Sequence, residues 1–364
     1  MNQLSPHYKR EKLLIMSKWK KCKLGEVITL NYGKSLPAKK RSGGDIPVYS
    51  SAGLTGWHDK ALVDSKGLII GRKGTIGKVY KSENPFYAID TSYYVLPNND
   101  VYDFDFLFFL LGSIRLDELN EDSAVPGLNR DTAYSQEIFL PSLPEQKAIA
   151  TVLSSLDDKI DLLHRQNKTL EAMAETLFRQ WFIEEAKEDW EQGKLGEIID
   201  ISSGKGLKKK EYVENGSYPV LGANGEIGRT DKCLFDEKLI FTGRVGTLGK
   251  IFISTGKVWL SDNTLVIKPK EDFFYFVYFL LKDIKLEGYN VGSTQPLVRQ
   301  SDIKEIEILL SGKEQLYNFE TEADLFFKKI QNNQLQIRTL EKLRDTLLPK
   351  LMSGEVRVDY NGSS

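Results

Sequence analysis

Two glycine-rich phrases carry the residues best suited to holding a phosphate group. Residues 71–78 read GRKGTIGK, and residues 243–250 read GRVGTLGK. A nucleotide-binding loop of the Walker type needs four residues between its first glycine and its Gly-Lys pair, followed by serine or threonine. Gly71 and Gly77 are separated by five residues, and neither phrase is followed by a hydroxyl residue. The spacing therefore argues against a nucleotide site and leaves the repetition to be explained.

A catalytic constellation is not evident in the sequence. The nearest approach to an amino-methyltransferase signature is NPFY at residues 84–87, where the signature requires proline in place of Phe86. Asn84 and Pro85 are better explained as a turn. The chain has 3 histidines and 2 cysteines, without a CxxC pair or a histidine cluster. We therefore predict no catalytic residue, no metal site and no disulfide framework, which fits a reducing cytoplasm.

Composition indicates a globular chain of two domains. The 364 residues are 41% hydrophobic and 28% charged, and the net charge of −1 means that any nucleic-acid surface must be local. The longest apolar runs, FDFLFFLL and FFYFVYFLL, are shorter than the ~18 residues of a membrane span and predict buried helices. The N-terminal segment lacks the apolar core of a signal peptide.

The two phrases belong to a duplication that covers most of the chain. WKKCKLGEVI at residues 19–28 matches WEQGKLGEII at residues 190–199. LNRDTAYSQEIFLPSLPEQ at residues 128–146 aligns with LVRQSDIKEIEILLSGKEQ at residues 297–315. Matching segments lie about 170 residues apart, far above the ~20–50 residues of solenoid repeats, so one long unit is present twice.

Each unit has a β-rich part followed by a helical part. Short alternating runs broken by glycine, proline, asparagine and aspartate fill the first ~120 residues and predict strands and tight turns. The last ~40 residues show an apolar heptad pattern that predicts a long helix. The predicted seam residues are Leu153, Leu156, Ile160, Leu163, Asn167, Leu170, Ala174, Leu177 and Trp181, and then Phe326, Ile330, Asn333, Ile337, Leu340, Leu347 and Leu351.

The apolar stripe of a heptad helix needs a partner to cover it. We predict that the two helices pair antiparallel, with the polar seam residues Asn167, Asn333 and Arg344 fixing the register. The alternative, that each helix only caps its own domain, stays open. The predicted fold class is therefore α+β: two similar, mostly-β globular domains separated by two long antiparallel coiled-coil helices, with internal duplication.

Two globular domains, or heads, held apart by paired helices suggest a protein that binds two sites on a duplex at a fixed distance. The segment from Leu153 to Trp181 is roughly 42 Å long at ~1.5 Å per residue. That length corresponds to about 12 base pairs.

This order of domains resembles the specificity subunit of Type I DNA restriction-modification systems. The resemblance is carried by KLGEVI and KLGEII, by the two glycine-rich phrases, and by IFLPSLPEQKAIATVLSSLDDKI at the start of the first helix. LRDTLLPKLMSGEVRV near the C-terminus is also similar to the ending of that family. The second unit departs from the pattern, because it has LLSGKEQ where the first unit has LPSLPEQ. The prolines at the entry to the first long helix are therefore missing at the entry to the second long helix.

The resemblance implies target-recognition domains that each read one half of a split DNA sequence. The predicted segments are an extension at 1–18, the first such domain at 19–143, the first helix at 144–186, the second domain at 187–312, the second helix at 313–358 and a tail at 359–364.

The resemblance also implies partners and cofactors. The chain would bind double-stranded DNA and two methyltransferase subunits, and a restriction or motor subunit where one exists, with no membrane. It would hold no cofactor itself, with S-adenosylmethionine in the methyltransferase subunit and ATP and magnesium in the motor subunit. We expect a non-catalytic, cytoplasmic subunit.

Phosphate binding favours lysine and arginine, and base reading favours arginine, asparagine, glutamine and hydroxyl residues. Clusters of such residues recur at equivalent places in the two units, although basic clusters are often only solvated surface. The predicted DNA contacts are Lys34, Lys39, Lys40, Arg41, Arg72, Lys73, Thr75, Lys78 and Arg130 in the first domain, and Lys205, Lys208, Lys209, Lys210, Asn224, Arg244, Thr247, Lys250 and Arg299 in the second.

Residues shared by both domains should contact phosphate, because the domains read different sequences. Arg72 and Arg244 fit that role, whereas the glycines around them predict a tight hairpin. Base reading should lie where the copies differ, as in residues 50–57 against 222–229. Arg130 and Arg299, aligned with each other, are either structural or phosphate-contacting.

Two other classes of function stay open. A self-contained DNA-modifying enzyme requires a catalytic constellation, which the sequence does not offer. A two-headed scaffold for protein or glycan requires that the basic loops be dispensable. Salt dependence separates the scaffold from a DNA reader, because phosphate contacts make affinity fall steeply with salt.

Overall fold

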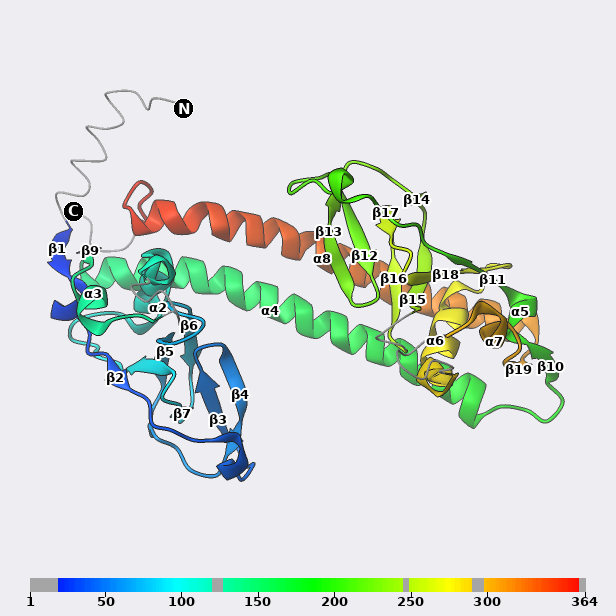
Figure 1. Cartoon of the computed structure of the whole chain (residues 1–364), viewed down its shortest axis with the longest axis horizontal. Helices are drawn as coiled ribbons and strands as arrows, with labels where there is room; N and C mark the ends of the chain where they lie inside the picture. Colours follow the sequence, from blue (N-terminus) through cyan, green and yellow to red (C-terminus); the bar gives the residue numbers. More distant parts are fainter. Residues whose placement is uncertain (1–18, 120–126, 245–248, 290–297, 360–364) are drawn as a thin grey trace. The chain divides into compact units, whose positions relative to one another are not determined.

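The computed structural model describes residues 19–119, 127–244, 249–289 and 298–359 (Figure 1). The predicted extension at 1–18 and most of the predicted tail lie outside these residues. The chain divides into two compact units. The first unit consists of two segments, the residues up to Leu163 and those from Leu335 onward, and the second unit runs from His164 to Gln334. Each unit contains one β-rich head and a part of each long helix.

The first head is built from short strands and short helices. Its strands are β1 (Lys20–Lys23), β2 (Asn31–Tyr32), β3 (Ile46–Ser50), β4 (Gly53–His58), β5 (Gly67–Gly71), β6 (Val79–Ser82), β7 (Tyr87–Ala88), β8 (Ser92–Val95) and β9 (Glu137–Leu140). Its helices are η1 (Leu24–Glu26), η2 (Ala38–Lys40), α2 (Phe104–Ser113), η3 (Leu116–Glu118) and α3 (Arg130–Tyr134). In the described part of this head, the strands form sheets in the orders β2-β8-β5-β6, β4-β3-β7 and β1-β9.

The second head repeats this topology. Its strands are β10 (Glu191–Lys194), β11 (Ile199–Ser203), β12 (Tyr218–Gly222), β13 (Gly225–Thr230), β14 (Phe235–Asp236), β15 (Leu239–Gly243), β16 (Ile251–Ser254), β17 (Lys257–Leu260), β18 (Thr264–Pro269) and β19 (Glu307–Leu310). Its helices are α5 (Leu195–Ile198), η5 (Lys209–Glu211), α6 (Phe274–Ile284), η6 (Leu286–Tyr289) and α7 (Gln300–Lys304). The sheet orders β11-β18-β15-β16, β13-β12-β17-β14 and β10-β19 match those of the first head except that β14 is added at one edge, which confirms the duplication.

Each head has a fully buried strand inside its four-stranded sheet, β5 in the first head and β15 in the second. Every residue of β5 and of β15 is buried, as expected for short apolar runs covered on both faces. The helices α2 and α6 contact the edge strands β6 and β16. These helices are the two longest apolar runs of the sequence, so their prediction as buried helices is confirmed.

The long helices are α4 (Leu143–Arg179), which continues into the π-helical turn η4 (Gln180–Glu184), and α8 (Lys313–Met352). They run antiparallel in each unit. In the first unit the Arg344 guanidinium lies 2.9 Å from the Asp157 carboxylate. In the second, Asn333 Nδ2 donates to Asn167 Oδ1 at 2.9 Å. The predicted antiparallel pairing is confirmed. Within the described residues, no helix is long and apolar enough to cross a membrane.

The predicted seam is too narrow near the C-terminal end of α4. Leu177 and Trp181 are only partly buried, whereas Phe178 and Phe182 are buried. Here α4 packs against α6 as well as α8, and the Phe182 ring lies 4.9 Å from that of Phe276. A heptad stripe assumes a single partner, and a second partner widens the buried face.

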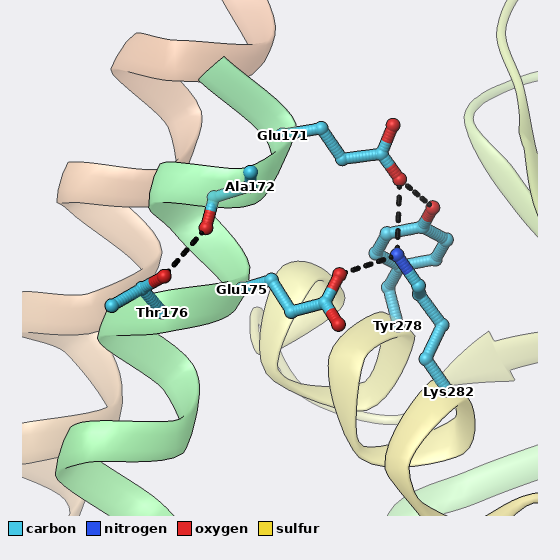
Figure 2. Close-up of polar contacts among 6 residues, drawn as sticks. All are labelled: Glu171, Ala172, Glu175, Thr176, Tyr278 and Lys282. Atoms are coloured by element: carbon cyan, nitrogen blue, oxygen red, sulfur yellow. Dashed lines mark hydrogen bonds and ion pairs between the residues drawn. The ribbon is translucent and has the colours of Figure 1, made fainter. Parts of the chain in front are cut away.

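Polar contacts also join α6 to α4 in the second unit (Figure 2). Figure 2 shows Lys282 between Glu171 and Glu175, which lie one turn apart on α4, with Nζ–O distances of 3.1 and 2.9 Å. The Tyr278 hydroxyl donates to Glu171 at 2.9 Å. Burial lowers the pKa of Lys282, but the hydrogen bonds to both carboxylates outweigh it and leave the pKa raised. This helix end is therefore part of the core of its head, as well as one half of a coiled coil.

Candidate nucleic-acid interface

The first glycine-rich phrase forms the turn between β5 and β6. Gly71 N donates to Lys78 O at 2.9 Å, and Gly77 N donates to Gly71 O at 2.9 Å. Gly77 has φ of +71°, and a Cβ atom there would lie 2.1 Å from Asp117 N. The hairpin prediction is confirmed, and the close approach explains why glycine is needed at this position.

The second phrase lies between β15 and β16, which pair antiparallel as β5 and β6 do. Gly249, which occupies the place of Gly77, has φ of +82°. Residues 245–248, including the predicted contact Thr247, lie outside the described residues. Lys250 is exposed at the end of the turn.

The arginine shared by both phrases is anchored in the same way in each head. Arg72 N donates to Thr91 O at 2.9 Å, and Arg244 N donates to Asn263 O at 2.8 Å. Both acceptors directly precede the strand that pairs with β5 or β15. The backbone of the two heads therefore presents these side chains from equivalent positions.

The Arg72 guanidinium lies against two tyrosine rings. Its Cζ atom is 5.2 Å from the centre of the Tyr32 ring and 5.8 Å from that of Tyr93, and Nη2 donates to Asp90 O at 2.9 Å. Burial, together with the neighbouring Tyr32, raises the pKa of Tyr93 to about 12, so the Tyr93 ring stays neutral at physiological pH. The two rings and the Asp90 carbonyl together hold the guanidinium in place.

Three predicted contacts of the first head meet at one cavity. Arg72, Lys73 and Arg130 line it together with Tyr32 and Tyr93, and its volume is about 320 Å³. Asp131 also lines this cavity, so its lining carries three cations and one acid. That charge and size suit a phosphate or the edge of a base. The sequence interpretation missed both tyrosines. The available signal was their position on strands that pair beside the glycine-rich phrase.

Thr75 and Lys78 do not reach that cavity. They line a separate hollow of about 540 Å³, whose other wall includes Asp157 and Arg344 of the long helices. The glycine-rich phrase thus contributes to two different surfaces of the first unit.

The remaining basic residues lie on exposed loops. Lys34 N donates to Ala88 O, and Lys205 N donates to Leu260 O, which places these two lysines at equivalent positions. The other exposed lysines are Lys39 and Lys40 on η2, and Lys208, Lys209 and Lys210 at η5. Arg41 differs, because its Nη1 donates to Thr55 O at 2.6 Å and ties this loop to β4.

The stretches predicted to read bases are the hairpins β3–β4 and β12–β13. Asn224 is exposed at the tip between β12 and β13. Trp57 on β4 and Ile227 on β13 are 48% and 53% exposed, so each hairpin offers one large apolar side chain at its surface. Arg229 instead holds its own hairpin, since its Nε donates to Gly216 O at 2.7 Å.

The backbone fixes how the segments that begin at Gly127 and Val298 align between the two heads. The Arg72 carbonyl accepts from Leu128 N at 2.8 Å, and the Arg244 carbonyl accepts from Val298 N at 3.2 Å. Leu128 therefore corresponds to Val298.

This register corrects the predicted match of Arg130 with Arg299. Asn129 is the N-cap residue of α3, and Arg299 is the N-cap residue of α7. Arg130 thus corresponds to Gln300. The alignment by sequence was shifted by one residue because two identities in a short motif outweighed the register of the strands and helices that follow.

Fold and site together define an internally duplicated protein with two β-rich heads, paired long helices and an arginine at the same backbone position in each head. The family model described as "Type I restriction modification DNA specificity domain" matches residues 16–172 and again residues 187–318. The chain belongs to this family.

Relatives of this chain carry the same description. The Type I restriction enzyme MjaIX specificity subunit of Methanocaldococcus jannaschii is 30% identical, over 92% of this chain and 92% of that protein. The Type I restriction enzyme HindI specificity subunit of Haemophilus influenzae is 22% identical, over 74% of this chain and 81% of that protein. The crystal structure of the S subunit of a Type-I restriction-modification system from M. genitalium has the same fold, with a TM-score of 0.63, 21% identity and coverage of 94% of this chain and 97% of that chain.

Proposed function

We propose that this chain is the DNA-recognition subunit of a Type I restriction-modification complex, in which each head reads one half of a bipartite target. The carrying observation is the pair of equivalent arginines, Arg72 and Arg244, each presented by the same backbone hydrogen bond beside a variable surface. A shared cation suits the phosphate backbone, which is the same in every sequence. Variable surroundings suit the bases, which differ between half-sites.

The exposed lysines of η2 and η5 extend this basic surface in the two heads. Their recurrence at equivalent places, in a chain of net charge −1, supports a local DNA-binding face on each head. The family membership supports the same conclusion.

The catalytic work belongs to partner subunits in this proposal. Two methyltransferase subunits would bind S-adenosylmethionine and transfer its methyl group to DNA, and a motor subunit, where one exists, would use ATP and magnesium. The chain itself would bind no cofactor. The long helices α4 and α8 would hold the heads at a set spacing and bind the methyltransferase subunits.

The test is methylome sequencing of cells that express this chain with its methyltransferase subunit. We expect modification at a two-part sequence with a fixed gap, and none when either protein is expressed alone. Methyl transfer by the purified chain with S-adenosylmethionine would contradict the non-catalytic assignment. Modification at a single undivided sequence would contradict the reading of one half-site by each head.

A further inference from the structure

Arg130 and Gln300 occupy the same position in the two heads but offer different chemistry. Each is the first residue of a short helix, two residues after the amide that binds the carbonyl of the shared arginine. Neither is required by the fold at that position, since an arginine in one head and a glutamine in the other support the same local backbone.

In the first head, Arg130 belongs to a cage of cations and aromatic rings. Its Cζ atom lies 5.2 Å from the centre of the Tyr32 ring, the same ring that Arg72 contacts. Arg130 is exposed and lines the cavity described above. The ring face of Tyr32 therefore holds the Arg130 guanidinium at this cavity.

In the second head, an amide and a hydroxyl replace this cage. Gln300 Nε2 donates to Ser203 Oγ at 3.0 Å. Ser203 takes the place of Tyr32, because it pairs with Leu265 as Tyr32 pairs with Tyr93. The contact fixes the orientation of the Gln300 amide, as Tyr32 fixes the guanidinium of Arg130.

The two side chains match different bases. Arginine binds the O6 and N7 acceptors of guanine through two hydrogen bonds, and glutamine binds the N6 donor and N7 acceptor of adenine. A residue that contacts only phosphate has no reason to change between the heads, and Arg72 and Arg244 do not change.

We infer that Arg130 and Gln300 determine specificity, each by reading one base at the corresponding place of its half-site: guanine for Arg130 and adenine for Gln300. This inference rests on the proposed function. It adds which residue of each head carries one base preference, and what that preference is.

The test is selection from a DNA pool with both half-sites randomised, with the complete chain assembled with its methyltransferase subunit. Wild type is compared with Arg130→Gln and with the reciprocal variant Gln300→Arg. Arg130→Gln should lower the preference for guanine at one position of the first half-site by roughly 5- to 150-fold, the effect of one bidentate contact. Gln300→Arg should lower the preference for adenine at one position of the second half-site.

Each variant is the control for the other, because the half-site of the unchanged head must keep its full preference. That retained preference also shows that the variant is folded. Equal weakening on all sequences, with a salt slope lower by about one, would assign the residue to phosphate and overturn the inference. Unchanged preference, or loss of preference over a whole half-site, would overturn it too. A wild-type complex without any two-part preference would instead refute the proposed function.

Discussion

The partly buried asparagine pair between α4 and α8 leads to a prediction about the stability of the second unit. Asn333 is fully buried, its Nδ2 donates to Asn167 Oδ1, and its own Oδ1 has no hydrogen-bond partner among the described residues. The duplication supplies an apolar alternative, because Asn167 and Asn333 align with Ile337 and Leu163. Those two residues are 5% and 2% exposed and pack in one cluster in the first unit. The double variant Asn167→Ile/Asn333→Leu therefore copies a seam layer that this chain already contains.

The structure sets the expected magnitude and sign. A buried polar group without a partner lowers stability by ~1–3 kcal/mol, whereas removal of both partners is neutral or stabilising. Asn167→Ile alone leaves the Asn333 amide without its partner and should lower the free energy of unfolding by about 1–3 kcal/mol. The double variant should raise it by about 1–3 kcal/mol, from added apolar burial and removal of the unpaired oxygen. The sign should thus reverse between the single and the double variant.

The assay is denaturant unfolding followed by circular dichroism, with thermal unfolding in parallel. A change of 1 kcal/mol should shift Tm by roughly 2–4 °C in a unit of this size. The matched control is Leu163→Asn/Ile337→Asn, which places a second polar pair in the apolar layer and should lower the free energy of unfolding. A double variant less stable than wild type would refute the reasoning, and so would a single variant equal to wild type.

Further outcomes follow from the site and from the buried acid of α8. Arg72→Ala or Arg244→Ala should weaken binding to all DNA sequences alike and lower the salt slope by about one, as measured by salt-titrated binding; a change in preference at one base would assign the arginine to base reading instead. Burial raises the pKa of Glu320 from 4.5 to about 7, although the Phe276 amide and the Lys238 charge act to lower it. Since the folded-state pKa lies above the unfolded one, stability should fall as pH rises from about 4.5 to about 7. Glu320→Gln keeps an acceptor for that amide and should remove this loss, up to about 3 kcal/mol at ~1.4 kcal/mol per unit. The measurement is the free energy of unfolding of wild type and of Glu320→Gln between about pH 5 and about pH 8. An equal decline in the two proteins would contradict the role of Glu320.

Much of the fold was predictable because the duplication supplies its own comparison. A strand or helix pattern that occurs twice at one offset is less ambiguous than a single occurrence, and both apolar helices were identified in this way. The heptad pattern predicted the antiparallel pair. It did not predict Phe178 and Phe182 as core residues, because a seven-residue period describes one partner helix and α4 has two neighbours at that end.

The site was less predictable for a physical reason. Arg72 stood out by residue type and repetition, but Tyr32 and Tyr93 are ordinary strand residues until the sheet order brings them beside it. Gln300 was hidden by an alignment shifted by one residue, which only the backbone hydrogen bonds corrected. Arg41 also stood out by residue type, and the contact of its guanidinium with Thr55 in the hairpin of β4 became visible only in the structure. Its role as a DNA contact stays a prediction.

We predict that the long helices α4 and α8 set the gap between the two half-sites. One heptad inserted after Gln166 and another after Asn333 keeps the apolar seam and leaves the Asn167–Asn333 pair intact. Each insertion adds roughly 10 Å at ~1.5 Å per residue. On DNA this distance is about three base pairs, and it turns the second half-site by roughly 100° around the duplex.

The decisive measurement is selection from a DNA pool with randomised gap lengths, with wild-type and lengthened chains each assembled with the methyltransferase subunit. We expect the wild-type chain to select two half-sites separated by one fixed gap length. The lengthened chain should either prefer a gap longer by about two to four base pairs or lose two-part binding, while each head keeps its base preference. Tight binding of the lengthened chain at the original gap would contradict the account.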